Sequence, residues 1–213
     1  MHDYLTVDGR KISKSSGRTV DPVALTEEYG PDAVRWWLLR EVPRVGDADF
    51  TLDRLIARAD DELANGLGNL VNRVVSMVHR YRAGRVPVTG AIPPDAADIE
   101  AACRRAPGLV AGALADFDFR QATSAAWTVV DEANRYVNHV RPWALARAEG
   151  AGDTSAAARL DAVLAALVQA CRTLAVLLEP FLPDAAARVA GQCTDVDGRL
   201  PAASPLFRRI GPR

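Results

Sequence analysis

A short polar segment near the start of the chain contains the residue types that hold phosphate. Residues 11–17 read KISKSSG and include two lysines, three serines and one glycine. Ammonium groups supply positive charge, hydroxyl and backbone N–H groups donate hydrogen bonds, and glycine lets the backbone bend toward an anion. The segment therefore suits a phosphate-bearing ligand. For a Lys- and Ser-rich turn, a solvated loop is the alternative.

A second candidate surface lies on a long predicted helix. Asn65, Asn69 and Arg73 follow one another at four-residue spacing, which places them on one helical face with Asn72 beside them. Asparagine is unfavourable inside helices, so this row predicts either a solvated face or a face that hydrogen-bonds a ligand. The same helix ends in a cluster of three arginines, Arg80, Arg82 and Arg85. These are either phosphate contacts or the cations that a helix C-terminus attracts.

Other unusual residues are better explained by packing. Gly66 and Gly68 each cost a helix interior about 1 kcal/mol relative to alanine, so we expect another helix or loop to approach them closely. Trp36 and Trp37 are neighbours on a predicted helix and point about 100° apart, so their rings cannot form one stacking platform. We expect both to pack at the joint between the polar segment and the later helices.

The elements that must position these residues are mostly helical. Residues 4–7 predict a short strand without a partner in the chain, which reads as the remnant of a sheet domain. Helices are expected over residues 22–29, 31–42, 52–84, 98–116, 119–140, 156–178 and 184–192. The fold class is therefore mostly α, a bundle of about five helices after a fragment of something else.

Composition limits the classes of protein to which the chain can belong. Its 213 residues carry 26 Lys and Arg against 27 Asp and Glu, a formal net charge of -1. This balance excludes binding of polyanions through bulk charge, so any nucleic-acid contact needs local sites. The cysteines and histidines show no metal-ligand pattern, and no membrane span or secretion signal is evident. We expect a cytoplasmic protein with no metal site and no membrane contact.

Three separated strings resemble one protein family. Residues 7–41, VDGRKISKSSGRTVDPVALTEEYGPDAVRWWLLRE, resemble the KMSKS region of class I aminoacyl-tRNA synthetases in its methionyl form. Residues 63–78, LANGLGNLVNRVVSMV, and residues 133–150, ANRYVNHVRPWALARAEG, are similar to the anticodon-binding helices of the same family. The three strings occur in the family's order and cover nearly the whole chain.

The resemblance implies a domain organisation and an activity. Residues 1–50 would be the end of a Rossmann-like catalytic domain with its KMSKS loop, residues 51–192 a helical anticodon-binding domain, and residues 193–213 an irregular tail. The family charges tRNA(Met) with methionine in an ATP-dependent ligase reaction, in which Mg²⁺ is expected to accompany ATP. Lys11 and Lys14 would be catalytic, and Ser13, Lys14 and Ser15 would bind ATP.

The resemblance also assigns the anticodon contacts. Asn69 and Arg73 match positions that contact anticodon bases, for which amide and guanidinium groups are well suited. Trp143 matches a tryptophan on which an anticodon base stacks, worth roughly 1 to 3 kcal/mol. From the residues alone, a tryptophan buried at the Pro142 bend is the alternative.

The family's HIGH signature and methionine pocket do not occur in these residues. We therefore expect the 213-residue chain alone to be unable to form methionyl-adenylate. Methionine-dependent exchange of pyrophosphate into ATP, measured on protein free of host synthetase, checks this, and exchange above the blank would contradict it. Either the chain is the C-terminal part of a longer synthetase, or it is a stand-alone tRNA-binding paralogue without catalysis.

Two further alternatives come from related enzymes. A synthetase-like ligase of small-molecule biosynthesis would keep the ATP loop and lose tRNA recognition. Class I synthetases for leucine, valine, isoleucine or cysteine also combine a KMSKS loop with a helical anticodon domain. The Asn/Arg helix together with the RPW segment, residues 141–143, favours methionine.

Overall fold

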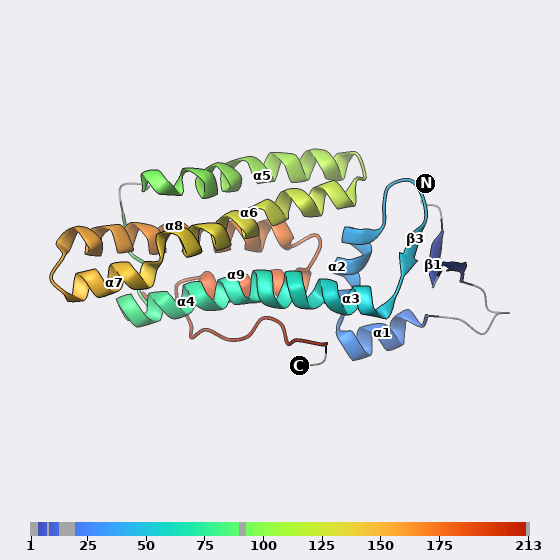
Figure 1. Cartoon of the computed structure of the whole chain (residues 1–213), viewed down its shortest axis with the longest axis horizontal. Coiled ribbons are helices and arrows are strands. Elements are labelled where there is room, and N and C mark those ends of the chain that lie inside the picture. Colours follow the sequence, from blue (N-terminus) through green and yellow to red (C-terminus); the bar gives the residue numbers. More distant parts are fainter. Residues whose placement is uncertain (1–3, 8, 13–19, 90–92, 212–213) are drawn as a thin grey trace.

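The computed structural model describes residues 4–7, 9–12, 20–89 and 93–211. Within these residues the chain is mainly helical. Long helices run along the molecule's long axis, and a small sheet lies at one end (Figure 1). The expected fold class, a helical bundle with a remnant of a sheet, is confirmed.

Among the described residues the sheet has three short strands, and it corrects one expectation. β1 (Leu5–Val7) lies in the middle, antiparallel to β2 (Arg10–Lys11) and parallel to β3 (Ala48–Phe50). The strand predicted over residues 4–7 therefore has partners. The prediction missed β3 because three residues are too few to display an alternating pattern. Its pairing with β1 is a contact between segments about forty residues apart, which no local pattern reports.

Two carboxylates, Asp47 just before β3 and Asp49 within it, tie the sheet together. Asp47 Oδ1 accepts the backbone N–H of Tyr4 at 2.8 Å. Asp49 Oδ1 accepts the backbone N–H of Gly9 and the hydroxyl of Thr6, each at 2.7 Å. These donors stabilise the ionised form, so the pKa of Asp49 lies below its ordinary value, chiefly through the Gly9 N–H. The ionised form of Asp49 thus joins β1 to β3.

Two helices follow where the capping signals place them. α1 (Pro22–Tyr29) begins after Asp21, whose side chain accepts the N–H of Val23 at 2.9 Å. Gly30, with φ of 87°, ends α1, and α2 (Pro31–Glu41) starts directly after it. The predicted boundaries of α1 are confirmed, and α2 ends one residue before its predicted end.

The α2 helix joins two hydrophobic cores. Trp36 is fully buried in the core of the helical bundle, where its ring lies 5.0 Å from that of Trp127. Trp37 is buried in a smaller core next to the sheet, 4.9 Å from the ring of Phe50. Neighbouring helical residues point in different directions, which is how one helix serves both cores. The expected packing role of the two tryptophans at this joint is confirmed.

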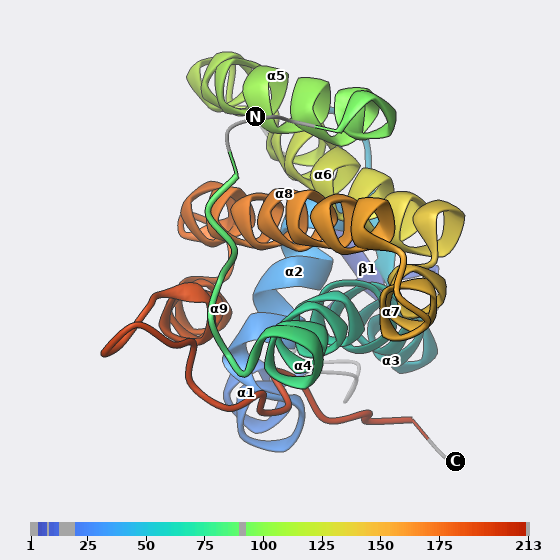
Figure 2. The same cartoon turned by 90° about the vertical axis from the view of Figure 1, so that its left-hand side faces the viewer.

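The bundle consists of long helical rods. The first rod is continuous but not uniform: α3 (Leu52–Arg58), the π-helical segment η2 (Ala59–Gly68) and α4 (Asn69–Arg82). After the short 3₁₀ turn η3 (Pro94–Ala96) come α5 (Ala97–Ala115), α6 (Phe119–Val140), α7 (Pro142–Gly150), α8 (Thr154–Leu178) and α9 (Pro183–Cys193). Viewed from the end opposite the sheet, α7 lies beside α4, and α8 lies between them and α5 (Figure 2).

Two features of the bundle differ from the expectation. The helix expected over residues 52–84 is π-helical in its middle, at η2. The helix α7 was not predicted, because nine residues after a proline show too little periodicity. Both departures lie next to the candidate surface.

The α8 helix is long and apolar enough to cross a membrane by length and composition alone. It is, however, the central helix of the bundle, with residues such as Leu164, Leu167 and Leu174 fully buried. It packs against α4, α5, α6, α7 and α9. This is the environment of a core helix in a soluble protein.

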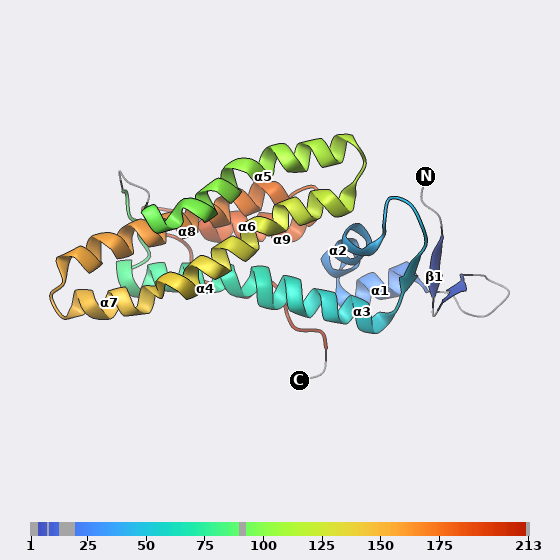
Figure 3. The same ribbon diagram turned by 45° about the horizontal axis from the view of Figure 1, so that its top comes forward.

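The segment after α9 is irregular, as expected, and it packs closely on the bundle. It runs along α4 on the face away from α5 and α6 (Figure 3). Leu200 and Leu206 are buried, and the side chain of Gln192 exchanges two 3.0 Å hydrogen bonds with the backbone of Ser204. The carboxylate of Asp60 accepts the backbone N–H groups of residues 210 and 211. The tail therefore packs directly against η2, which contains Asp60.

Candidate nucleic-acid interface

The α4 helix separates an apolar face from a polar one. Its buried residues are Leu70, Val71, Val74, Val75, Met77 and Val78. Asn69, Ser76 and Arg80 are exposed on the remaining surface, and Arg73 is half-buried there. Because the apolar face is fully used by the bundle, the polar face is available to a ligand.

The guanidinium of Arg73 is held by a neighbouring helix. Its Nη2 donates a hydrogen bond to Asn138 Oδ1 on α6 at 3.3 Å. Within the described part of the chain this is the one hydrogen bond of the guanidinium, and it leaves most of the five donors for other acceptors. Sequence reasoning did not single out Asn138, although an exposed asparagine inside a helix was the signal used for Asn69.

The α6 helix ends beside this pair, and the next helix, α7, presents a tryptophan. Arg141 has a left-handed backbone with φ of 53°, and Pro142 is the first residue of α7. Trp143 follows and is 38% exposed, whereas Trp36 and Trp127 are at most 5% exposed. The structure therefore does not bury Trp143 at the bend. An exposed indole, an oriented guanidinium and the exposed amide of Asn69 are the groups that stack on bases and read their edges.

The arginines at the end of α4 have different surroundings. Arg82 pairs with Glu149 of α7 at 3.1 Å and with Asp161 of α8. Burial alone would lower its pKa, but these carboxylates outweigh burial and raise it. Arg82 therefore joins three helices and is not a free phosphate contact. Arg80 and Arg85 are exposed, with Arg80 lying 5.7 Å from the ring of Tyr81.

The two glycines of the rod confirm the expected close approaches. A Cβ atom on Gly66 would lie 2.9 Å from Cζ2 of Trp127 on α6. A Cβ atom on Gly68 would lie 3.3 Å from the ring of Phe207 in the tail. Gly66 therefore allows α6 to pack closely against η2, and Gly68 allows the tail to do so.

The asparagine row is not one straight line. The change from π to α geometry falls between Gly68 and Asn69, so four-residue spacing marks a turn from Asn69 to Arg73 but not from Asn65 to Asn69. The side chain of Asn65 instead accepts a hydrogen bond from Arg209 of the tail. The expected common face thus holds only for Asn69 and Arg73.

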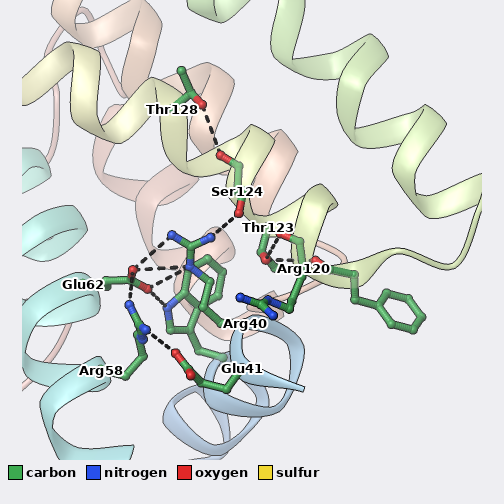
Figure 4. Close-up of polar contacts among 10 residues, drawn as sticks. Arg40, Glu41, Arg58, Glu62, Arg120, Thr123, Ser124 and Thr128 are labelled. Atoms are coloured by element: carbon green, nitrogen blue, oxygen red, sulfur yellow. Dashed lines mark hydrogen bonds and ion pairs between the residues drawn. The ribbon is translucent and has the colours of Figure 1, made fainter. Parts of the chain in front are cut away.

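A charged cluster ties α2 to η2 (Figure 4). The carboxylate of Glu62 accepts the indole N–H of Trp36 at 2.6 Å, Arg40 Nη2 at 3.2 Å and Arg58 Nη1 at 2.8 Å. Arg58 also pairs with Glu41, and Arg40 with Ser124 of α6. Near this cluster, burial raises the pKa of Asp131, and the charge of Glu62 adds to the effect.

The polar segment predicted to bind ATP lies mostly beyond the structural description. Lys11 is the last residue of β2, but Ser13, Lys14 and Ser15 fall outside the described residues. Their roles therefore stay predictions. In the part of the chain that the structure describes, no group of three or more His, Cys, Asp or Glu side chains could hold a metal ion.

Family models match both parts of the chain. Residues 1–75 match the model of class I tRNA synthetases (M). Residues 86–205, more than half of the chain, match the anticodon binding domain of methionyl tRNA ligase. The second match contains α5 to α9 and therefore Asn138 and Trp143.

Similar whole proteins are methionine--tRNA ligases. The enzyme of Clostridium perfringens is 35% identical over 191 residues, which cover 90% of this chain and 29% of that protein. The enzyme of Caldanaerobacter subterraneus subsp. tengcongensis is 37% identical over 183 residues, 86% of this chain and 28% of that protein. The chain thus spans less than a third of the length of these relatives.

A solved structure shares the fold. Mycobacterium tuberculosis methionyl-tRNA synthetase bound by methionyl-adenylate superposes with a TM-score of 0.89 at 31% identity. The match covers 97% of this chain and 43% of that chain. Together with the family models and the relatives, this likeness shows that the chain belongs to the methionyl-tRNA synthetase family of class I aminoacyl-tRNA synthetases.

Proposed function

We propose that this chain is part of a methionine--tRNA ligase and supplies its KMSKS loop and its anticodon-binding surface. The observation that carries the proposal is the exposed indole of Trp143 on the helix that follows the Arg73–Asn138 pair. The partner is tRNA(Met), and the reaction joins methionine to it at the expense of ATP in the cytoplasm. The domain limits 1–50, 51–192 and 193–213 belong to the same proposal.

The surface fits a splayed single-stranded anticodon. A stacked base would lie on Trp143, and the amide of Asn69 and the guanidinium of Arg73 would hydrogen-bond base edges. Single-stranded loop bases expose those edges, which helical RNA hides in its deep major groove. A chain with nearly balanced charge must rely on such shaped contacts to discriminate its tRNA.

The ATP-binding part of the proposal rests on the KMSKS resemblance. Lys11 and Lys14 would meet the negative charge that develops on the triphosphate, where positioned cations help the transition state more than the ground state. Ser13 and Ser15 would donate hydrogen bonds to phosphate oxygens. Mg²⁺ would accompany ATP and neutralise part of its charge.

Binding of anticodon stem-loops tests the proposal. We expect the chain to bind a stem-loop with a CAU anticodon more tightly than one with a changed anticodon, in a titration at fixed salt. Equal affinity for both would contradict anticodon recognition and favour the small-molecule ligase. Binding restricted to a leucine, valine, isoleucine or cysteine anticodon would overturn the methionine assignment.

Arg73→Ala is expected to lower the affinity for the CAU stem-loop by about tenfold or more, because a guanidinium bonded to a base edge is worth about 1–3 kcal/mol. Asn138→Ala should lower it less, since it removes only the acceptor that orients Arg73. Fluorescence titration with a labelled stem-loop measures both changes.

Arg104→Ala is the matched control for these variants. Arg104 is an exposed arginine on α5, a helix separated from α4 by the rest of the bundle (Figure 1). Its loss should leave the affinity for the CAU stem-loop unchanged. A loss of affinity for Arg104→Ala equal to that for Arg73→Ala would show general charge attraction rather than a defined site.

A further inference from the structure

The π-helical segment η2 directly precedes the residues proposed to read the anticodon. The backbone N–H of Asn69 reaches the carbonyl of Ala64, five residues earlier, as in a π-helix. A turn closed by such bonds holds more residues than an α-helical turn, so it changes the rotation of everything that follows. The directions in which Asn69 and Arg73 point therefore depend on η2.

π-helical turns are rare, and this one is held from outside. Asn134 of α6 donates its side-chain amide to the carbonyl of Gly66 at 3.3 Å and to that of Val130 at 3.1 Å. The hydrogen bond to Val130 fixes the amide on its own helix, α6, so the hydrogen bond to Gly66 attaches η2 to α6. A segment with two glycines has little preference of its own for a regular helix, which makes such external contacts decisive.

The space around Gly66 leaves no room for a side chain. The nearest atom to a Cβ there is Cζ2 of the buried Trp127 ring, at 2.9 Å, followed by the backbone carbonyl oxygen of Asp61 at 3.5 Å and another atom of the Trp127 ring at 3.6 Å. That ring is itself fixed, because it is 5% exposed and packs on Trp36. A side chain at position 66 must therefore push η2 away from α6.

We propose that Gly66 and Asn134 are positioning residues for anticodon recognition: they hold η2 in its π-helical form and so set the rotation of Asn69 and Arg73. This inference rests on the proposed function and adds residues that touch no base. The hydrogen bond between Arg73 and Asn138 reflects this rotation of α4 relative to α6. Arg73 lies on α4, directly after η2, and Asn138 lies on α6, the helix that carries Asn134. A purely structural role would alter stability and leave discrimination between anticodons intact.

The test compares Gly66→Ala with a matched glycine. Gly66→Ala is expected to lower the affinity for the CAU stem-loop about tenfold and to reduce the ratio between CAU and changed anticodons, while helical circular dichroism persists. Gly112→Ala is the control, because a Cβ at this α5 position meets nothing within 4 Å. It should leave both the affinity and the ratio unchanged.

A compensating variant separates position from stability. Trp127→Phe shortens the ring beside Gly66, so Gly66→Ala combined with Trp127→Phe should regain most of the lost discrimination even though the second change opens a cavity. Asn134→Ala should reduce the same ratio without any clash. If Gly66→Ala fails to fold, Asn134→Ala and the double variant decide the matter.

The outcomes distinguish this inference from the proposed function. If the unaltered chain does not discriminate between anticodons, the proposed function fails. If the unaltered chain discriminates and Gly66→Ala or Asn134→Ala lowers only the free energy of unfolding, with the affinity ratio unchanged, the positioning role is overturned. Loss of the ratio in both variants, with rescue by Trp127→Phe, supports it.

Discussion

Replacing Trp143 by alanine is expected to weaken binding of a CAU-anticodon stem-loop by about tenfold or more, because stacking of a base on an aromatic ring is worth roughly 1–3 kcal/mol. The side chain is 38% exposed, so its removal opens no cavity in the core. The helical circular dichroism should therefore stay unchanged. Titration of both proteins with the same labelled stem-loop measures the effect.

Phe117→Ala provides a matched aromatic control. Phe117 is 72% exposed and lies between α5 and α6, at the opposite end of α6 from Trp143. Its removal should not change the affinity for the stem-loop. If the Trp143→Ala protein unfolds, Trp143 is a core residue. If its affinity for the CAU stem-loop is unchanged, Trp143 does not belong to the anticodon-binding surface.

Glu62→Ala is expected to lower the free energy of unfolding by about 2–3 kcal/mol. The Glu62 side chain is 13% exposed and receives donors from Trp36, Arg40 and Arg58. Without it, two guanidinium groups and one indole N–H lose their shared acceptor in a partly buried place. Arg58 is 36% exposed and can still reach water and Glu41, which keeps the loss below that of a fully buried pair.

Urea denaturation followed by circular dichroism measures this loss. Glu62→Gln should cost less, because its amide oxygen can still accept the Trp36 N–H. Glu100→Ala is the matched control, since Glu100 forms an exposed i,i+4 pair with Arg104 that contributes less than about 1 kcal/mol. A Glu62→Ala protein no less stable than Glu100→Ala would show that the cluster does not hold α2 against the bundle.

Local chemistry in the sequence was enough for much of the fold. The Asp21 cap, the proline after it and Gly30 placed α1 and α2, because caps and stops act through neighbouring backbone groups. Apolar periodicity placed the long rods, since each buries one face. The cost of Gly66 and Gly68 in a helix predicted close neighbours, and the structure supplies Trp127 and Phe207.

The candidate site could be predicted only in part from local sequence patterns. The strings around Asn69, Arg73 and Trp143 identified the region, and their roles stay predictions. Two further residues could be identified only from the packing of α6 beside α4 and η2. They are Asn138, which orients Arg73, and Asn134, which contacts Gly66. A spacing rule drawn along one helix cannot report which residue of another helix faces it.

The sequence by itself determined most of the helical segments apart from α7, where caps end α1 and α2, and which family the chain resembles, because these depend on residues a few positions apart. Only the tertiary structure decided the pairing of β1 with β3, the π-helical form of η2 and the engagement of Arg82 by Glu149 and Asp161. Each of these depends on groups brought together from distant parts of the chain. Their free energies arise from burial and pairing in the folded state, which local propensity does not encode.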